Sequence, residues 1–591
     1  MSYRAPVKDL LFVMKELAGI EAAAQLPGHE EAGYDTAAAV LEECAKLAEG
    51  VIAPLNREGD KNPSAFANGE VRTTPGFKDA FRQYAEGGWQ GLQHPTEFGG
   101  QGLSKLIHAG CAEMINGANL SFALCPLLTD GAIEALLTAG TPEQQATYIP
   151  KMVDGSWTGS MNLTEPQAGS DLSQVRTRAE PQPDGSYKLF GTKIFITYGE
   201  HDLAGNIVHL VLARVAGAPD GVKGISLFIC PKVLADGSRN DVHCVSIEHK
   251  LGIKASPTAV LQYGDHGGAV GYLVGQENRG LEYMFIMMNA ARFGVGLQGI
   301  GLAEHAYQQA VDYARDRVQS RPVDGSLPAA AAIIHHPDVR RMLMTMRAHT
   351  EGCRALALVA AAAYDAAHAH PDAEARKQNQ TFYEFLVPLV KGYSTEMSLE
   401  VASLGVQVHG GMGFIEETGA AQHLRDAKIL TIYEGTTAIQ ANDLVGRKTG
   451  RDGGATARGI AAQVEATEAA LAARASADGK AVAKRLAAAR MAFLDVVDFM
   501  CAQSRSHPNA AYAGSVPYLM LAGSLLAGWQ MARALIAAED RIAAGQDVEF
   551  MKAKVVTARF YADHILVKAG ALRDSIVDGA DAVTALALES F

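Results

Sequence analysis

Apolar residues at helical spacing dominate the first part of the chain. Leu10 and Met14 lie one helical turn apart, and Ala37–Leu47 is rich in residues that favour helices. Thr141 followed by Pro142 is typical of a helix start, because threonine caps exposed amides and proline tolerates the first turn. The pattern predicts an N-terminal domain made mainly of helices.

Short runs of β-forming residues then replace the helical pattern. Clusters of Gly, Pro and Asp separate these runs, as expected of a compact sheet or barrel. No long helical pattern interrupts them, which disfavours a parallel sheet built from strand–helix–strand units. The predicted strands are Tyr187–Phe190, Lys193–Thr197, Ile207–Ala213, Ile225–Cys230, Val242–Ile247 and Ala259–Tyr263.

Helical spacing returns after Gly280. Val339, Met342, Leu343 and Met346 follow the i, i+3, i+4, i+7 pattern of one buried helix face. Ala-rich helical sequence runs from about residue 455 almost to the C-terminus. Further helices are expected over Glu282–Val318, over Phe382–Val408 and after Thr437, and Thr449–Gly454 is the strongest candidate for a linker.

These changes of pattern predict four segments in an α+β, mainly α, protein. An N-terminal helical domain is expected at residues 1–156 and a middle β-domain at 157–277. A helical bundle domain follows at 278–447, and an additional helical domain at 448–591.

Composition and charge narrow the classes of function. Of 591 residues, 48% are hydrophobic and 20% are charged, which is typical of a well-buried globular protein and excludes wholesale disorder. The net charge of −13 repels nucleic acid and anionic membranes, so no nucleic-acid partner is expected. A local basic pocket could still bind an anion.

Cysteine usage and hydropathy bear on location. The seven cysteines are dispersed and never spaced C-x-x-C, which argues against a disulfide framework and a zinc site, so no metal is expected. No signal peptide is evident, and the longest nearly apolar run, around Ala355–Tyr364, is too short to span a bilayer. We therefore expect a cytoplasmic protein with no transmembrane segment.

Small and hydroxyl residues gather in Asn162–Asp171. Thr164 and Ser170 offer hydroxyls, and Gly169 lets the backbone approach a ligand closely. Such a stretch suits a phosphate or a planar ring with carbonyl edges, although an ordinary turn entering the sheet is the alternative. No G-x-G-x-x-G fingerprint follows a strand here, so nicotinamide binding in that mode is not supported.

Two further stretches are candidates for ligand contact. On a strand, Phe195 and Thr197 face the same way, so a ring and a hydroxyl could pack against and hydrogen-bond a flavin. A half-buried strand with a core phenylalanine is the alternative. The glycines of Gln407–Phe414 are adequately explained as the C-terminal stop of a helix.

Glu434 stands in a largely apolar neighbourhood, directly after Ile429–Tyr433 and before a glycine and two threonines. Such surroundings disfavour a charged carboxylate and raise its pKa, as a general base working near neutrality requires. The alternative is a glutamate at a helix N-terminus that interacts favourably with the helix dipole.

Together these stretches closely resemble the acyl-CoA dehydrogenase family over roughly residues 35–447. The match is specific, because T-E-P-x-A-G-S-D at 164–171 rarely coincides with I-Y-E-G-T at 432–436 preceded by L-R-D-A-K. The resemblance implies an N-terminal helical domain, a middle β-domain and a C-terminal four-helix bundle, with FAD at their junction.

The resemblance also implies cofactor contacts. Phe195 matches an aromatic residue that packs at the flavin ring, and Thr197 matches a hydroxyl near its N5 atom. Arg317, Gln407 and Gly411 match residues that reach the FAD of a neighbouring subunit. The implied cofactor residues are Met161, Leu163, Thr164, Ser170, Phe195, Thr197, Arg317, Gln407, Gly411 and Thr436.

Glu434 matches the catalytic base of the family. A subset of relatives carries the base on another helix, directly before the arginine that Arg292 matches, but Ala291 stands there and cannot serve. Arg292 itself matches an arginine on the CoA side of the cleft. The implied substrate residues are Ser170, Asn289, Arg292, Tyr433 and Gly435.

The implied reaction is α,β-dehydrogenation of an acyl-CoA. Glu434 would remove the pro-R α-proton while a β-hydride passes to FAD, giving a trans-2-enoyl-CoA. In the family, the backbone amide of this residue and a ribityl hydroxyl stabilise the developing enolate charge. Electrons would then pass singly to an electron-transferring flavoprotein.

Two departures from common family members bear on assembly and substrate. The chain is longer by about the domain after Gly450, and enlarged relatives tend to be homodimers. Lys250–Thr258 and Tyr3–Pro6 resemble a bacterial branch often labelled 3-methylmercaptopropionyl-CoA dehydrogenase. That branch also contains medium- and long-chain fatty acyl-CoA dehydrogenases, so both kinds of substrate stay open.

Other functions are also compatible with the sequence. An acyl-CoA oxidase would share the fold and the base but pass electrons to oxygen. A flavin-free helical scaffold would be colourless, whereas a yellow protein bleached by acyl-CoA would exclude it. Four cations of the last domain give weak support for a membrane-surface role, but such cations more often belong to a solvated helix face: Lys552, Lys554, Arg559 and Lys568.

Overall fold

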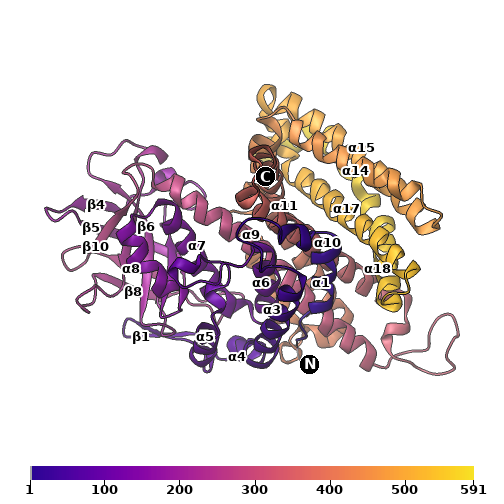
Figure 1. Cartoon of the computed structure of the whole chain (residues 1–591), viewed down its shortest axis with the longest axis horizontal. Coiled ribbons are helices and arrows are strands. Elements are labelled where there is room, and N and C mark those ends of the chain that lie inside the picture. The colour runs from indigo at the N-terminus through magenta and orange to yellow at the C-terminus, as the bar shows by residue number, and fades with distance from the viewer. Residues whose placement is uncertain (1–2) are drawn as a thin grey trace. The chain divides into compact units, whose positions relative to one another are not determined.

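The computed structural model describes residues 3–591, which form two compact units (Figure 1). The sheet unit comprises Lys46–Leu103 and Ala118–Gly294. The helical unit comprises Met1–Ala45, Ser104–Gly117 and Val295–Phe591. The chain enters each unit more than once, so the residues of the expected N-terminal domain are shared between the two.

The sheet unit is built on a mixed eight-stranded sheet. Its strands are β3 (Trp157–Asn162), β4 (Arg178–Pro181), β5 (Tyr187–Thr197), β6 (Asn206–Val215), β7 (Ser226–Pro231), β8 (Val242–Ile247), β9 (Thr258–Tyr263) and β10 (Ala269–Val274). The order is β10-β7-β6-β4-β5-β9-β8, with β3 paired to β6. Because β10 also pairs with β5, five strands close on themselves as in a small barrel. Only β3–β6 and β4–β6 are parallel pairs among the described strands.

Six predicted strands correspond to five observed ones, since the runs from 187 to 190 and from 193 to 197 merge into β5. The strands that were not predicted are β3, β4, β10 and a small hairpin, β1 (Ala65–Ala67) with β2 (Glu70–Arg72). β3 was not predicted because its sequence contains several polar residues, although the strand is almost wholly buried. The hydroxyls of Thr158 and Ser160 are hydrogen-bonded to buried histidine rings, so these polar groups keep partners inside the protein.

Four helices complete the sheet unit: α4 (Pro54–Lys61), α5 (Phe77–Glu86), α7 (Leu120–Ala139) and α8 (Pro142–Val153). Both α7 and α8 lie beside the sheet (Figure 1), and their apolar faces join strand residues in one buried cluster. The predicted helix start at Thr141 is confirmed. Its side chain accepts from the Gln144 amide, and the Gln144 side chain accepts from the Thr141 amide at 3.0 Å.

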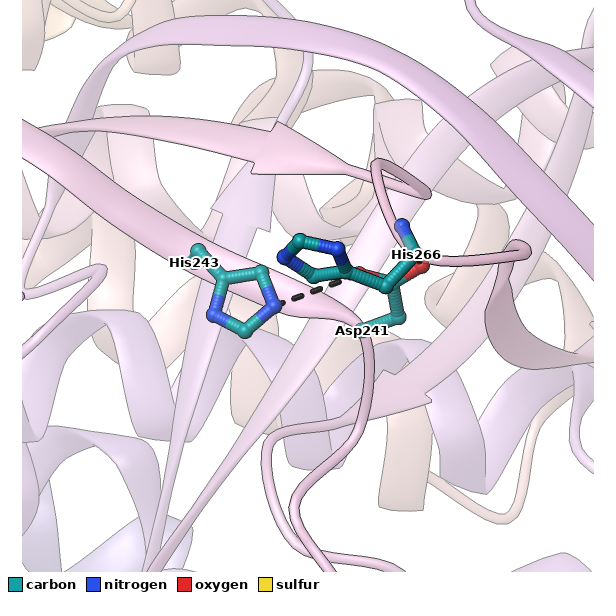
Figure 2. A group of neighbouring side chains, drawn as sticks. All are labelled: Asp241, His243 and His266. Carbon is teal, nitrogen blue, oxygen red and sulfur yellow. Dashed lines mark hydrogen bonds and ion pairs between the residues drawn. The ribbon is translucent and has the colours of Figure 1, made fainter.

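An aspartate organises the turn between β9 and β10 (Figure 2). The Asp241 Oδ2 atom accepts from the backbone amides of His266 at 2.7 Å and Gly268 at 3.0 Å. The Oδ1 atom lies 3.2 Å from Nε2 of His243. The potential ligand atoms of these three side chains lie within 4.8 Å of one another, but Oδ2 already holds the turn and Oδ1 contacts His243 on β8.

The helical unit holds the remaining helices. They are α1 (Val7–Glu16), α2 (Ile20–Ala23), α3 (Tyr34–Leu47), α6 (Lys105–Ala118), α9 (Gly280–Asp316), α10 (Pro337–Ala369), α11 (Ala373–His409), α12 (Ala420–Leu430), α13 (Thr437–Asp443), α14 (Ala455–Ala472), α15 (Ala477–Ser506), α16 (Pro508–Ala513), α17 (Ser515–Ala543), α18 (Val548–His564) and α19 (Ala569–Val577). Ends of α3, α6 and α9 reach into the sheet unit's part of the chain. The predicted apolar face of α10 is confirmed, because Met342, Leu343 and Met346 lie in a buried cluster.

The C-terminal helices do not form a separate unit. α17 packs against α10 and α11, and α18 packs against α10 and α17. The expected linker is instead a packed turn. The Thr449 side chain is buried and its hydroxyl is hydrogen-bonded to Tyr518 at 2.9 Å, while Gly453 and Gly454 adopt positive φ angles of 64° and 82°.

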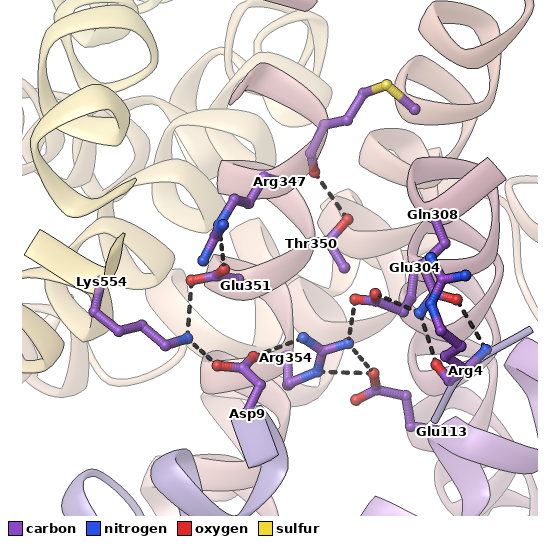
Figure 3. A network of polar contacts seen from close by, with 11 residues as sticks. Arg4, Asp9, Glu113, Glu304, Gln308, Arg347, Thr350, Glu351, Arg354 and Lys554 are labelled. Atoms are coloured by element: carbon purple, nitrogen blue, oxygen red, sulfur yellow. Dashed lines mark hydrogen bonds and ion pairs between the residues drawn. The ribbon is translucent and has the colours of Figure 1, made fainter. Parts of the chain in front are cut away.

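A buried ionic network joins several helices of this unit (Figure 3). Arg354 on α10 is 1% exposed and donates to Glu113 on α6, Glu304 on α9 and Asp9 on α1, at N–O distances of 2.5, 2.7 and 2.6 Å. Burial of a charge is costly unless it is paired. The three carboxylates supply that pairing and tie three helices to α10.

The same network reaches the C-terminal helices through Lys554 on α18 (Figure 3). Its ammonium contacts Glu351 at 2.9 Å and also pairs with Asp9. Lys554 is 2% exposed, so the expectation that it belongs to a solvated helix face was wrong. The ion pairs instead dock α18 onto α10 and α1.

Two helices of the described chain are long and apolar enough to cross a membrane by length and composition, α7 and α17. Both apolar helices are longer than the stretch around Ala355–Tyr364, so that stretch is not the longest apolar run of the chain. In each helix 83% of the apolar window is buried inside the structure, as is usual for the central helix of a globular domain.

Candidate active site

Glu434 lies at the tip of the turn between α12 and α13. Its φ angle is 55° and that of Gly435 is 86°, so two consecutive residues adopt the left-handed region. This conformation is unfavourable for a glutamate and persists only where the surroundings enforce it. The side chain is half-buried. The N-cap of α13 is Thr436, which accepts from the Ile439 amide, so Glu434 lies outside the helix rather than in its first turn.

Side chains from other helices hold this turn. The Lys391 ammonium on α11 donates to the Gly435 carbonyl at 2.6 Å, and the Gln440 amide on α13 donates to the carbonyls of Glu434 and Gly435 at 3.3 and 3.4 Å. Both supporting side chains are fully buried. Neither was predicted from the sequence, because no local pattern links Lys391 to a turn more than forty residues later.

Tyr433 connects the turn to α9. Its hydroxyl donates to the Gln298 side chain at 2.5 Å. Burial raises the pKa of Tyr433 well above its ordinary value, and the charge of the neighbouring Glu434 raises it further. The phenol therefore stays neutral at physiological pH and acts as a hydrogen-bond donor beside the carboxylate.

In the sheet unit, the predicted ligand loop from 162 to 171 is anchored by Glu165. This buried carboxylate pairs with the Lys193 ammonium at 2.8 Å and accepts from the backbone amides of Arg176 and Thr177. Burial alone would raise the pKa of Glu165, but the charge of Lys193 and the hydrogen bonds hold it at about 2. The carboxylate is therefore charged at every pH at which the protein functions.

The same ion pair joins the loop to β5. The Lys193 ammonium also donates to the Leu163 carbonyl at 2.9 Å, and the Ile194 amide donates to the Thr164 carbonyl at 2.9 Å. These bonds place the loop beside the strand that carries Phe195 and Thr197. The connection between the two stretches was not predicted, because it depends on contacts that neither stretch shows by itself.

Phe195 projects from a β-bulge of β5. The pairing register with β9 shifts between Lys193 and Ile196, and the φ angle of Phe195 is 60°. Its side chain is 59% exposed while Ile196 is 2% exposed and Thr197 is half-buried. An exposed aromatic face and a half-buried hydroxyl two residues further on fit a planar, hydrogen-bonding ring such as the flavin of FAD.

The other predicted residues fall into both units. In the sheet unit, Met161 is buried on β3, Ser170 is exposed, and Arg292 on α9 donates to Asn289 at 3.4 Å. In the helical unit, three residues are exposed near the ends of α9 and α11: Arg317, Gln407 and Gly411. Cationic, amide and glycine positions open to solvent fit contacts to a phosphate-bearing cofactor.

Comparison with known families covers nearly the whole chain. Residues 34–156, 160–266 and 278–448 match the N-terminal, middle and C-terminal domains of acyl-CoA dehydrogenases. Residues 460–587 match a domain described as acetyl-CoA dehydrogenase C-terminal like.

Individual proteins resemble the chain over its full length. A 3-methylmercaptopropionyl-CoA dehydrogenase of Ruegeria pomeroyi is 54% identical over 100% of both chains. A broad-specificity linear acyl-CoA dehydrogenase of Mycobacterium tuberculosis is 37% identical over 95% of both. An acyl-CoA dehydrogenase of Bacillus anthracis solved with FAD shares the fold, with a TM-score of 0.76 at 21% identity over 98% of this chain and 93% of that one. The chain therefore belongs to the acyl-CoA dehydrogenase family and catalyses the FAD-dependent dehydrogenation of an acyl-CoA.

Proposed function

We propose that the physiological substrate is 3-methylmercaptopropionyl-CoA. The observation that carries this proposal is the 54% identity, without truncation of either chain, to the Ruegeria pomeroyi enzyme of that name. The broad-specificity relative at 37% identity supports linear fatty acyl-CoA thioesters as the competing substrates. In either case one α C–H and one β C–H bond break and a trans double bond forms between the two carbons.

Glu434 is the proposed base that accepts the α-proton. The α-proton of a thioester is only weakly acidic, so the base must be oriented and partly withdrawn from water. A half-buried carboxylate at the tip of a strained, well-supported turn meets both needs. FAD, when bound, supplies the acceptor for the hydride equivalent that leaves the β-carbon.

Residues of the sheet unit are proposed to contact FAD. Phe195 would pack against the flavin ring and Thr197 would hydrogen-bond its edge, while Thr164 and Ser170 would supply hydroxyls from the loop that Glu165 anchors. The remaining residues proposed for the cofactor are Met161, Leu163, Arg317, Gln407, Gly411 and Thr436, and those proposed for the substrate are Asn289, Arg292, Tyr433 and Gly435.

We further propose a homodimer that donates electrons to an electron-transferring flavoprotein in the cytoplasm. Exposed apolar side chains support a subunit interface beside Gln407 and Gly411, namely Met412 at 46%, Phe414 at 86% and Ile415 at 44% exposure. Seven free cysteines agree with a reducing compartment.

Anaerobic flavin bleaching tests the substrate. Oxidised holoenzyme is mixed with 3-methylmercaptopropionyl-CoA and with saturated acyl-CoA thioesters from butyryl to palmitoyl, and the bimolecular rate of flavin reduction is measured for each. We expect the thioether substrate to reduce the flavin at least ten times faster than any of the linear substrates. A higher rate with a linear chain would assign the protein to fatty acyl-CoA oxidation instead.

The same preparation tests the electron acceptor. Substrate-reduced enzyme should be reoxidised by an electron-transferring flavoprotein far faster than by dissolved oxygen. Rapid reoxidation by oxygen with release of hydrogen peroxide would identify an acyl-CoA oxidase.

A further inference from the structure

The turn that carries Glu434 needs external support. Two consecutive positive φ angles place Glu434 and Gly435 in the left-handed region, which is unfavourable for a non-glycine residue such as Glu434. Turns between helices α12 and α13 need not take this form, because six residues are enough to connect two helices in several ways. Something outside the turn must therefore select the observed conformation.

Lys391 supplies the strongest contact to the turn. Its side chain is 0% exposed, and its ammonium donates to the Gly435 carbonyl across 2.6 Å. A charge-assisted hydrogen bond of this length is stronger than a neutral one, particularly in a buried setting. The contact fixes the carbonyl of the residue that directly follows the proposed base.

Gln440 on α13 holds the same turn from its C-terminal side. Its amide donates to the carbonyls of Glu434 and Gly435. Thr437 provides a third tie, since its hydroxyl donates to Glu396 on α11 at 2.5 Å. Helix α11 thus holds the turn at two points, through Lys391 and through Glu396.

We propose that Lys391 and Gln440 are positioning residues for the α-proton abstraction. They orient the Glu434 side chain by clamping the two peptide carbonyls on which its backbone conformation depends. This inference rests on the proposed role of Glu434 as the base. Lys391 is buried and lies more than forty residues before Glu434 in the sequence. The proposal gives it a function in the chemical step rather than in substrate or cofactor binding.

The main test uses Lys391→Met, which keeps the length of the side chain but removes its donor. Lys448→Met is the control, because that lysine pairs with Glu384 on α11 at 3.2 Å and donates to no group of the turn among the described residues. We expect the flavin-reduction rate of Lys391→Met to fall roughly 10- to 100-fold, the scale of a misplaced catalytic group. The substrate dissociation constant, the FAD content and the rate of the control variant should stay within about threefold of wild type.

Two further readouts separate positioning from general structural damage. With α-dideuterated substrate, the isotope effect on flavin reduction should rise in Lys391→Met, because abstraction of the α-proton becomes more strongly rate-limiting. In the Glu434→Gln background, the residual rate should not fall further when Lys391→Met is added, since a residue that acts through Glu434 has nothing left to position. An unchanged isotope effect, or the same loss in both backgrounds, would overturn the proposal.

The outcomes also separate this inference from the assignment of the base. If Glu434→Gln reduces its flavin at the wild-type rate, Glu434 is not the base. If Glu434→Gln is slow but Lys391→Met reduces its flavin at the wild-type rate, only the positioning role of Lys391 is contradicted. If Lys391→Met does not fold, Gln440→Met carries the test. We expect that variant to be slower by about 3- to 10-fold with a raised isotope effect, and a native rate would contradict the proposal.

Discussion

Gly435 shows at the level of one residue what limits the side chains that fit into the turn carrying Glu434. Its φ angle is 86°, and a Cβ atom at this position would lie 2.8 Å from Nε2 of Gln440 and 3.2 Å from Cγ2 of Ile439. A side chain would therefore strain the backbone and displace one of the groups that hold the turn.

We predict that Gly435→Ala lowers both stability and rate. The free energy of unfolding should fall by about 1–3 kcal/mol, and flavin reduction should slow at least tenfold because the base moves. Thermal unfolding and anaerobic stopped-flow measurements check the two parts.

Gly459→Ala is the matched control for this prediction. Gly459 lies on the exposed face of α14, its φ angle is not positive, and an alanine Cβ there would have no atom within 4 Å outside its own helix backbone. Alanine in a helix interior should stabilise the protein by about 0.5–1 kcal/mol relative to glycine. A Gly435→Ala variant that behaves like this control would show that the turn tolerates a side chain.

The residues of the site differ in how far sequence alone predicts them. Glu434 and Phe195 stand in compact motifs that the family resemblance singles out, although each stretch alone also fits an ordinary helix start or a core strand. Lys391, Gln440 and the pairing of Glu165 with Lys193 carry no such signal, because each depends on a contact between distant segments or on burial. Their roles become visible only when burial and hydrogen bonds are known.

Among the helices, α18 is held to the rest of the helical unit by buried charge. Lys554 is 2% exposed and pairs with Glu351 and Asp9, whereas Lys552 on the same helix is exposed and pairs only locally with Glu549 among the described residues. The two lysines therefore offer a direct comparison of a buried and a surface ion pair.

We predict that Lys554→Met costs about 1–3 kcal/mol, because Asp9 and Glu351 lose one buried charged donor and keep only Arg354 and Arg347 as cations. Lys552→Met should change the free energy of unfolding by less than about 1 kcal/mol. Chemical denaturation of both variants gives the comparison. Equal effects would mean that the network in Figure 3 contributes no more than surface pairs.

The strands show which elements a sequence pattern can predict. β6 to β9 are rich in β-branched and aromatic residues and were predicted nearly to their ends. β4 carries an arginine, a glutamate and a proline, and becomes a strand only through its pairing with β5 and β6. A strand defined mainly by its partners leaves little trace in its own composition.

For the molecule as a whole, buried histidines make stability depend on pH. Burial is the main reason that four histidines have a pKa below the ordinary value of 6.5. The pKa is about 3 for His201, His209 and His349 and about 4 for His305. Between pH 6.5 and these values the unfolded chain binds protons that the folded chain does not. Stability is therefore complete above pH 6.5 and is lost as the pH falls.

We predict a decrease of about 1.4 kcal/mol per pH unit for each of these histidines once the pH is well below 6.5. His349→Phe should remove one such contribution. Neither ring nitrogen of His349 has a hydrogen-bond partner among the described residues, so the phenyl ring loses no bond. The slope of unfolding free energy against pH between about 6 and 5 checks this. An unchanged slope in the variant would show that His349 is not neutral in the folded protein.

The contacts group the predicted segments of the chain into two units. Four successive segments were predicted and four family models match successive stretches, while each contact-defined unit is assembled from separate parts of the chain. The additional C-terminal helices belong to the same unit as the turn that carries Glu434, and α17 packs on the helix that supplies Lys391. Periodicity marks helices along the chain but does not indicate which of them share a core.

The proposed mechanism depends on Glu434 as the base that would remove the α-proton, with FAD as the acceptor of the hydride equivalent. Anaerobic stopped-flow reduction of FAD-loaded Glu434→Gln by 3-methylmercaptopropionyl-CoA is its most direct test. We predict a variant that binds FAD and substrate normally and reduces its flavin at least a thousandfold more slowly than wild type, within the range of about 10²–10⁴ that a positioned base contributes. Reduction at the wild-type rate would show that Glu434 is not the base.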